Sequence, residues 1–457
     1  MIYSGSEQVF INNCKEAIND TSLQDNINSN IKAHLKNVQK TEFAYNDLEK
    51  TKENASYVKN KSIINLPELL VTFEAKFEAN GGKVIWAQDA KEAISEITKI
   101  ISRNSERTLT YDNSLILNEI SLAENIKKEG VTCYPSDFHS YFAELQNETS
   151  THYTYPFVHK SRNDIKNFIV ENFTESDKYD FPYEVKDKLI EQSKKSDVYV
   201  SSANFIVADC GCLCVSENEG SNLVSSALSK VQIYVVGIDK IVPQIKDLYL
   251  LLPLYSTYSY GKKLNTYNNI IFGPKNTLEN REDEEVYVIL LDNGRTNVLE
   301  QKNQRRALAC INCGNCSNNS AVYKSIGGKV YGSTYVGPIG AVVTPLLNGF
   351  KEWKHLCMVE SANPIISKKC PININIHELI LYNRYFTYKH GMFTRTEKKL
   401  YPRYKKDMLS RRRIDKLSLK RKIKMFGKIK EDLQLESKQF PNFAQSTFKQ
   451  IYTGQND

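Results

Sequence analysis

The sequence predicts an α/β protein with a helical segment before the α/β region and a small helical, cysteine-bearing region after it. Between residues 61 and 298, short β-branched runs alternate with helical segments, a pattern typical of a mixed or parallel sheet covered by helices. A close group of cysteines follows between residues 299 and 390. The chain has 457 residues, which is enough for two or three domains with cores of their own.

Residues 1–60 are polar and rich in Asn and Lys. Within them, apolar residues recur every four positions at Leu23, Ile27, Ile31 and Leu35. That spacing places them on one face of a helix. We therefore expect an N-terminal helical segment that packs on another domain.

In the α/β region, residues 61–298, runs rich in Val and Ile predict the strands. These runs are 83–86, 198–200, 231–236 and 286–291. The region contains no Gly-x-Gly-x-x-Gly, Walker A or nucleophile-elbow motif. Nucleotide-dependent and hydrolase chemistry therefore have no positive support.

The cysteine-bearing region, residues 299–390, contains Cys310, Cys313 and Cys316 at regular spacing and a distant Cys370-Pro371. A close trio with a remote fourth thiol is the ligand pattern of a bacterial-ferredoxin [4Fe–4S] site. Pro371 fits this position because it removes a backbone donor and fixes the chain direction after the ligand. Four thiolates also suit zinc, although zinc sites more often pair two Cys-x-x-Cys segments. We favour the cluster and keep zinc as the alternative.

The C-terminal tail, residues 391–457, carries the basic character of the chain. Residues 391–430 contain sixteen Lys or Arg and three acids, a local charge of +13, whereas the whole chain carries +8. Met425 and Phe426 are interleaved on what can be an amphipathic helix. Such a segment can contact an acidic partner or a membrane surface, and a solvated helix is the plain alternative. We do not expect a nucleic-acid partner.

The cellular location is predicted from the lack of a membrane-spanning stretch, the lack of a signal peptide and the clustering of the cysteines. No stretch is long and apolar enough to span a bilayer, and the N-terminus lacks the basic and apolar segments of a signal peptide. The ten cysteines are clustered, which favours metal ligation in a reducing compartment. We expect a cytoplasmic protein, with peripheral binding at the inner face of the membrane as a possible role of the tail.

Many separated segments between residues 60 and 390 resemble one known family in the same order. They are 81–87, 203–205, 218–220, 236–243, 291–295, 309–316, 322–328, 331–333, 337–342, 344–347, 370–371 and 377–379. Together they resemble the lactate utilization protein B family. The resemblance implies a LUD domain at 61–298, with a sheet like that of ribose-phosphate isomerases and CoA transferases. It also implies an α-helical 4Fe-4S ferredoxin-type domain at 299–390.

The same resemblance implies a function. The family is the iron–sulfur subunit of a bacterial system that oxidises L-lactate to pyruvate, together with a CCG-domain protein and a second LUD-domain protein. On this interpretation the chain is an electron-transfer subunit of an oxidoreductase complex and not a stand-alone enzyme. The alternative is a redox-inactive LUD-domain interaction or scaffold protein with a structural metal site.

Departures from the family are concentrated on one set of ligands. Ser320, Asn363 and Ile366 stand where the family usually has the cysteines of a second cluster, whereas Cys310, Cys313, Cys316 and Cys370 all remain. Joint loss of one set predicts a single [4Fe–4S] cluster and a redox partner that docks near Cys310 to Cys316. Cys357 has the wrong spacing for a substitute ligand, and we expect a buried thiol there.

The α/β region also contains a candidate ligand cleft at the carboxyl edge of its sheet, where open α/β sheets bind ligands. Its candidates match family positions, and the two histidines are candidate general bases. They are Asn204, Asp209, Glu219, Gly220, His152 and His159. Leu223 occupies a position where the family often has Arg, which removes a bidentate partner for an anion.

Three more thiols, Cys210, Cys212 and Cys214, alternate along the chain where the family usually reads Glu-Thr-Gly-Thr from position 209. Alternation with period two predicts that they share one face of a strand. An extra metal or redox site is one interpretation. We favour small buried residues, because free cysteine is commonly packed as a small hydrophobe.

Overall fold

A computed structural model describes residues 5–104, 107–146, 148, 151–173, 181–274 and 284–393, and separate short stretches between 398 and 453. The chain divides into two compact units, residues 1–384 and residues 385–457. The larger unit contains both sheets and all ten cysteines.

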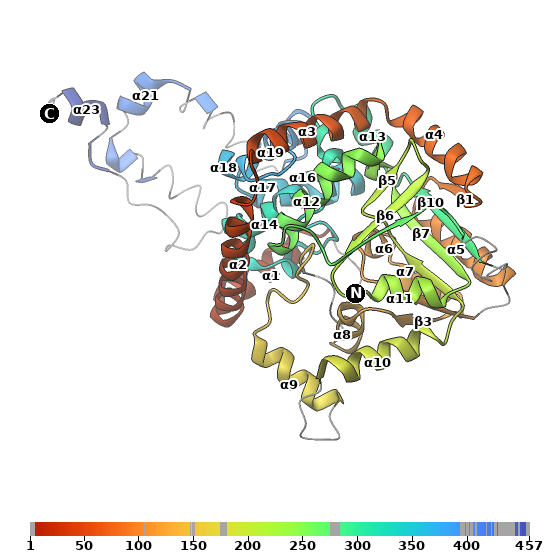
Figure 1. Cartoon of the computed structure of the whole chain (residues 1–457). Coiled ribbons are helices and arrows are strands. Elements are labelled where there is room, and N and C mark those ends of the chain that lie inside the picture. Colours follow the sequence, from red (N-terminus) through yellow and green to blue (C-terminus); the bar gives the residue numbers. More distant parts are fainter. Residues whose placement is uncertain are drawn as a thin grey trace. The chain divides into compact units, whose positions relative to one another are not determined.

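The main sheet of the larger unit has six parallel strands in the order β1-β10-β7-β4-β2-β3 (Figure 1). Their bounds are β1 (Lys83–Ala87), β2 (Thr108–Tyr111), β3 (Thr132–Pro135), β4 (Val198–Ser201), β7 (Val231–Gly237) and β10 (Glu285–Leu291). The four runs predicted from sequence are β1, β4, β7 and β10, which are neighbours in the sheet. The α/β prediction is confirmed.

Both faces of this sheet are buried, because successive side chains of each strand point to opposite sides. In β7, Ile233 and Val235 belong to one core, whereas Tyr234 and Val236 belong to the other. Helices α5 (Ala90–Arg103), α6 (Leu115–Glu119) and α7 (Leu122–Lys128) supply the first core. Helix α4 (Leu66–Ala79) supplies Phe73 and Phe77 to the second.

A smaller sheet packs in the second core with α4 and has the order β8-β5-β6-β9. Its strands are β5 (Phe205–Val207), β6 (Cys212–Glu217), β8 (Ile241–Val242) and β9 (Tyr267–Ile271). Strands β5 and β6 form an antiparallel hairpin, and β8 pairs with β5 in parallel. Because β8 follows β7 directly along the chain, the two sheets are joined at the carboxyl end of β7.

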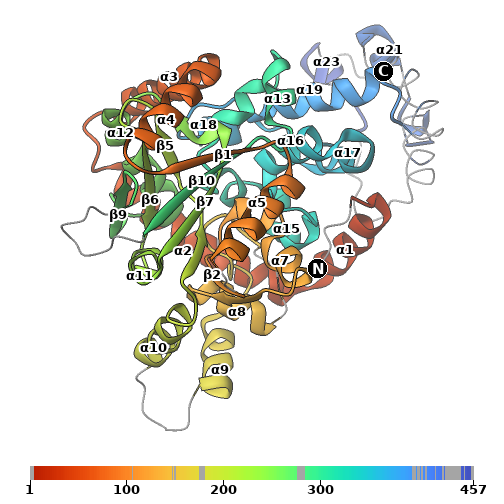
Figure 2. The same ribbon diagram turned by 90° about the vertical axis from the view of Figure 1, so that its right-hand side faces the viewer.

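The remaining helices of the α/β region surround these sheets (Figure 2). They are α8 (Phe138–Gln146), α9 (Arg162–Phe173), α10 (Phe181–Ser193), α11 (Ser221–Leu228), α12 (Leu248–Tyr260) and α13 (Arg295–Glu300). Phe142 of α8 and Phe168 of α9 are buried against each other, with ring centroids 4.2 Å apart. This contact gives α8 and α9 a small core of their own.

The N-terminal helices share a core with the cysteine-bearing region. They are α1 (Glu7–Asn19), α2 (Thr21–Glu42) and α3 (Leu48–Ile64). The cysteine-bearing region consists of the short helix η4 (Arg305–Ala309) and α14 (Asn315–Asn318), α15 (Ala321–Ile326), η5 (Lys329–Tyr331), α16 (Gly337–Asn348), α17 (Phe350–Val359), α18 (Pro364–Lys368) and α19 (Ile376–Lys389). Ile27 and Ile31 of α2 are buried with Tyr323, Trp353 and Leu356. The N-terminal helical face therefore packs on another part of the chain, as its four-residue spacing predicted.

The smaller unit contains the described helices α21 (Arg411–Lys416) and α23 (Phe448–Thr453). Met425 and Phe426, which suggested an amphipathic helix, lie outside the described residues. Among the helices that the structure describes, none has both the length and the apolar character needed to cross a membrane.

Candidate metal centre and adjoining pocket

The four cysteines predicted as ligands come together around one cavity of about 20 Å³. Cys310 and Cys313 come from the turn between η4 and α14, Cys316 lies in α14, and Cys370 comes from the segment after α18. Cys313, Cys316 and Cys370 are buried, and Cys310 is partly exposed. We call this arrangement the cysteine cage. Its other lining residues include Tyr153, Ile339, Pro371 and Ile372.

Two left-handed residues shape the turn that carries the first three thiols. Asn312 has φ +58° and Gly314 has φ +73°. A Cβ at Gly314 would lie 2.7 Å from Cε1 of His152, so this position requires glycine for space as well as for conformation. The turn is therefore fixed against the loop that contains His152.

Hydrogen bonds tie the two cysteine segments to each other. Asn315 Nδ2 donates to the carbonyl of Lys369 at 2.7 Å, immediately before Cys370. A guanidinium nitrogen of Arg306 donates to the carbonyl of Ile372 at 2.9 Å and also to the carbonyl of Ser56 in α3 at 3.2 Å. Hydrogen bonds to α3 and within the cysteine-bearing region thus stabilise the two segments that form the cage.

The thiols of the cage interact electrostatically with one another. Burial, with a smaller contribution from the neighbouring Cys310, raises the pKa of Cys370 to about 11. Burial and the other three thiols likewise raise the pKa of Cys313 well above its ordinary value. Without a bound cation the cage therefore favours neutral thiols, because several thiolates would share a dry site.

Three cationic side chains surround the cage. Lys240 Nζ donates to the carbonyl of Cys310 at 2.9 Å and pairs with Asp239 at 2.7 Å. Lys59 is fully buried and donates to the carbonyl of Asp239 at 2.7 Å; burial and the neighbouring Lys240 lower its pKa to about 7. Lys240 and Lys59 lower the pKa of Cys310, and Arg306 lowers that of Cys370. These cations thus counteract part of the rise in thiol pKa that burial causes.

The three positions that lack family cysteines are occupied by residues with structural roles. Ser320 Oγ donates to the buried carboxyl group of Glu360 at 3.1 Å and accepts from the backbone N–H of Tyr323, which caps α15. The hydroxyl of Tyr331 donates to the same carboxyl group. Asn363 caps α18, and Ile366 is buried. We call Ser320, Tyr331 and Glu360 the Glu360 cluster.

Cys357 lies in α17, where it is buried and its Sγ lies 3.0 Å from the carbonyl oxygen of Lys354. It does not line the cage cavity. The sequence expectation of a buried thiol agrees with this placement.

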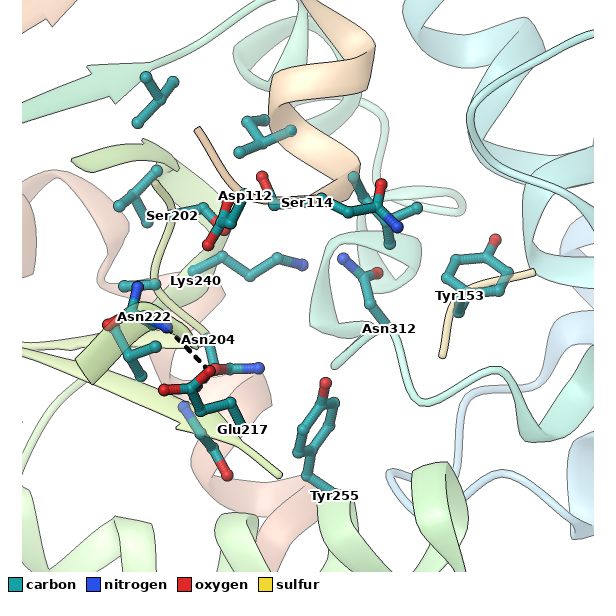
Figure 3. A pocket seen from close by; sticks show the side chains of 18 of the residues that line it. Asp112, Ser114, Tyr153, Ser202, Asn204, Glu217, Asn222, Lys240, Tyr255 and Asn312 are labelled. Atoms are coloured by element: carbon teal, nitrogen blue, oxygen red, sulfur yellow. Dashed lines mark hydrogen bonds between the residues drawn. The ribbon is translucent and has the colours of Figure 1, made fainter. Parts of the chain in front are cut away.

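A second and larger cavity, of about 220 Å³, lies at the carboxyl ends of β2, β4 and β7. Asn204 and Glu219, two of the predicted cleft residues, line it. Ile311 and Asn312 of the cysteine turn also line it, so the pocket joins the sheet edge to the cage. In Figure 3, Lys240 extends across the cavity toward Asn312, between Asp112 and Glu217.

Asp112, which lines this pocket, is an acid that accepts a hydrogen bond. Asp112 follows β2, and burial raises its pKa to about 8, so the carboxyl group is largely neutral at pH 7. Ser201 Oγ donates to Asp112 Oδ2 at 2.6 Å, and Asn222 Nδ2 donates to Ser201 Oγ at 2.8 Å. The pocket therefore presents both a neutral acid, Asp112, and the side chain of Lys240.

A buried arginine connects the pocket to the cysteine-bearing region. Arg295 binds Glu119 with both terminal nitrogens, at 2.9 and 2.8 Å, and its Nε donates to Asp239 at 2.6 Å. It also donates to the hydroxyl of Tyr335 at 3.2 Å. Burial alone would raise the pKa of Glu119, but the charge and the hydrogen bonds of Arg295 lower this pKa below its ordinary value. This bidentate pair holds the ends of α6, β7 and β10 together.

Sequence reasoning missed several residues of this region: Glu119, Lys240, Arg295 and Asp112. Lys240 and Arg295 lie inside segments that resemble the family, so a signal for them existed. Asp112 has only a local signal, its position directly after a strand. Glu119 has none, because its partner Arg295 is distant in sequence.

The remaining predicted cleft residues do not line the pocket. His152 Nδ1 accepts from the N–H groups of Thr154 and Tyr155, and its Nε2 lies 3.0 Å from Asn318 Oδ1. Burial lowers the pKa of His152 to about 3, so this ring is a neutral support for the cage turn. His159 pairs with Glu148 at 3.1 Å.

Asp209, Gly220 and Leu223 have local structural roles: the Asp209 carboxylate accepts a hydrogen bond, and Gly220 and Leu223 act through the backbone. Asp209 lies in the turn of the β5–β6 hairpin and accepts from the N–H of Ile245. Gly220 has φ +78° at the start of α11, and the N–H of Leu223 donates to Glu217 Oε1 at 3.0 Å. The Leu223 side chain is exposed.

Comparison with known proteins agrees with this architecture. The family model for the LUD domain matches residues 70–291. Over 382 residues the chain is 30% identical to lactate utilization protein B of Bacillus cereus (strain AH820), which covers 83% of this chain and 80% of the relative. The chain belongs to the lactate utilization protein B family. The family protein of Bacillus thuringiensis (strain Al Hakam) is 29% identical over the same shares of both chains.

A solved structure of a DUF162 family protein from Deinococcus radiodurans aligns with 50% of this member of the lactate utilization protein B family and with 98% of its own chain. The TM-score is 0.29 and the identity is 11%. So distant a likeness carries no argument about the present fold.

Proposed function

We propose that this chain is an iron–sulfur electron-transfer protein of lactate utilization that holds one [4Fe–4S] cluster. The observation that carries the proposal is the cysteine cage: four thiols from two distant segments line one cavity. A trio with a remote fourth thiol is the ligand pattern of such clusters. The lactate assignment is supported by the name that the relatives carry.

The spacing of the sulfur atoms favours a cluster over a single zinc ion. Within the described residues, the one place where three ligand atoms of His, Cys, Asp or Glu all lie within 4.8 Å of one another is formed by Asp137, His139 and Glu219. The cage sulfurs are therefore more widely spread than thiolates on one zinc ion, which lie about 3.8 Å apart for Zn–S bonds of about 2.3 Å.

The charges around the cage support a bound cluster, because the cluster and its four thiolate ligands together are anionic. When bound, a [4Fe–4S] cluster supplies one-electron redox chemistry through four thiolate ligands. Lys240, Lys59 and Arg306 offset the negative charge of those thiolates. Arg306 and Asn315 hold the two ligand segments in register.

The larger pocket supports a redox role because its wall includes the turn between two of the ligands. A small polar molecule bound beside Asp112 and Lys240 would lie against Asn312, the residue before Cys313. Electrons could pass between this pocket and the cage over a short distance. We place the docking surface for a CCG-domain protein and a second LUD-domain protein near this turn.

Anaerobic purification followed by iron and acid-labile sulfide analysis tests the cluster. We expect about four irons and four sulfides per chain and an absorption band that bleaches with dithionite and returns on reoxidation. About eight irons would contradict the single cluster, and zinc without iron would contradict the redox function. Co-purification from cells grown on lactate tests the partners, with CCG-domain and LUD-domain proteins as the expected result.

The alternative function is a redox-inactive scaffold, and the Glu360 cluster is the observation that favours it. Ser320, at one of the three positions where the family usually has a cysteine, instead donates to Glu360, which also accepts from Tyr331. A bound metal that cannot be reduced and reoxidised would establish this alternative.

A further inference from the structure

A pair of thiols far along the chain from the cage lies in unusually close contact. Cys212 is the first residue of β6, and Cys210 lies in the turn before it. Their Sγ atoms are 3.1 Å apart. A disulfide needs about 2.05 Å, so a shift of about 1 Å would bring the two atoms to bonding distance. The sequence expectation of three thiols on one strand is corrected here: Cys212 and Cys214 lie on β6, and Cys210 does not.

The turn that carries Cys210 is held on several sides. The N–H of Asp209 donates to the carbonyl of Pro243 at 3.1 Å, and Asn80 Nδ2 donates to the carbonyl of Cys210 at 3.0 Å. Gly211 has φ +59°, and a Cβ there would lie 2.4 Å from the backbone nitrogen of Phe77. The glycine thus allows the turn to sit on the end of α4 and keeps the two thiols facing each other.

The two thiols differ in accessibility. Cys210 is partly exposed, whereas Cys212 and Cys214 are completely buried. Burial raises the pKa of Cys210, but the hydrogen bond with Cys212 counteracts that rise. Cys210 is therefore the thiol that a reagent from solvent reaches first.

We propose that Cys210 and Cys212 form a thiol–disulfide exchange site whose substrate is a low-molecular-weight disulfide. The Cys210 thiolate attacks one sulfur of the reagent, which forms a mixed disulfide and releases the first thiol as its thiolate, RS⁻. The released RS⁻ takes the proton of Cys212, and the Cys212 thiolate attacks Sγ of Cys210, which releases a second RS⁻ that is protonated from solvent. In sum, two protein thiols and one disulfide RSSR give one protein disulfide and two RSH, a two-electron transfer. This site is separate from the proposed cluster and does not depend on it.

Thiol labelling of the full chain tests the site. The protein, purified anaerobically with its metal, is equilibrated for hours with oxidised or with reduced glutathione, quenched in acid, denatured and alkylated. Trypsin should release residues 196–230, which contain Cys210, Cys212 and Cys214 and no other cysteine or internal Lys or Arg. We expect three alkylated thiols after the reduced buffer and one after the oxidised buffer, with a mass lower by 2 Da before alkylation.

Variants locate the pair. Cys214→Ser should keep the loss of two thiols, because Cys214 is outside the contact, whereas Cys210→Ser should abolish it. Cys210 is partly exposed, so its replacement by Ser should leave the fold and the metal content unchanged. Three labelled thiols in both buffers would overturn the proposal. So would a protected pair that persists in Cys210→Ser or disappears in Cys214→Ser.

Discussion

The cysteine cage and the Glu360 cluster lie in the same helical region, but they differ in whether their polar groups are satisfied without a bound ligand. In the cage, four thiols, three of them buried, surround a cavity, and burial and mutual repulsion raise the pKa of Cys313. In the Glu360 cluster, Ser320 and Tyr331 donate hydrogen bonds to one buried carboxyl group. The first arrangement requires a cation to become stable as thiolates, whereas the second is satisfied by its own side chains.

This difference shows how positions without thiols are satisfied by their own surroundings. Removing thiolates alone would leave holes and unpaired groups, each of which costs stability. Here Ser320 and Asn363 cap helices, and Ile366 is buried. All three side chains thus contribute to folding without a metal.

Removal of a cage ligand should have the largest effect. In Cys313→Ala we expect iron to fall from about four per chain to below one, because three thiols cannot complete the site. Cys357→Ala is the matched control, since Cys357 is buried in the same region outside the cage, and it should retain its iron. Inductively coupled plasma spectrometry measures both. Equal iron loss in the two variants would remove the distinction between cage and non-cage thiols.

Truncation in the Glu360 cluster should affect stability and leave the metal in place. Glu360→Ala leaves the hydroxyls of Ser320 and Tyr331 without their acceptor and opens a cavity, so we expect a loss of roughly 2–4 kcal/mol. Anaerobic denaturant unfolding measures the change, and iron analysis should still give the wild-type content. A variant of normal stability that has lost its iron would mean that Glu360 serves the metal.

Charge near the cage should tune the cluster. Lys240→Met removes a cation hydrogen-bonded to the Cys310 carbonyl, so we expect the reduction potential to fall by tens of millivolts, as about one charge at an effective dielectric constant near 20 would give. Lys246→Met, an exposed lysine a few residues later, is the control. A redox titration followed by absorbance compares them. An unchanged potential in Lys240→Met would contradict electrostatic coupling to the cage.

The Glu360 cluster should also respond to pH. Burial raises the pKa of Glu360 above its ordinary value of 4.5. The folded state therefore binds more protons than the unfolded state between the ordinary and the raised pKa, and stability should fall as pH rises through that interval. Glu360→Gln cannot ionise and should flatten this part of the stability curve. Parallel curves for the two proteins would show that Glu360 does not titrate differently on folding.

Returning one thiol to the Glu360 cluster should have the smallest effect. Ser320→Cys weakens the cap of α15, at a cost of about 1 kcal/mol, and supplies one ligand where Asn363 and Ile366 supply none. Iron should remain near four per chain. A rise toward eight would show that the second site keeps its capacity for a cluster.

The fold could be predicted from the sequence in those segments whose local residue pattern determines their secondary structure. The runs 83–86, 198–200, 231–236 and 286–291 are strands because β-branched residues with period two suit a sheet buried on both faces. The spacing of Ile27 and Ile31 likewise identified the buried face of α2. The candidate cleft was accessible only in part. Asn204 and Glu219 line the pocket, whereas His152 and His159 are structural, because a sequence does not say which polar groups a histidine will meet.

The sequence by itself determined the α/β class, and it predicted Cys310, Cys313, Cys316 and Cys370 as one set of ligands, since both depend on residue type and spacing. Only the tertiary structure decided that Cys370 meets the trio and that Arg295 joins Glu119 to Asp239. It also decided that Glu360 accepts from Ser320 and that Cys210 faces Cys212. The packing of the two sheets and the surrounding helices determines which segments these contacts join and how the side chains are oriented. Local sequence has no means to encode such distances.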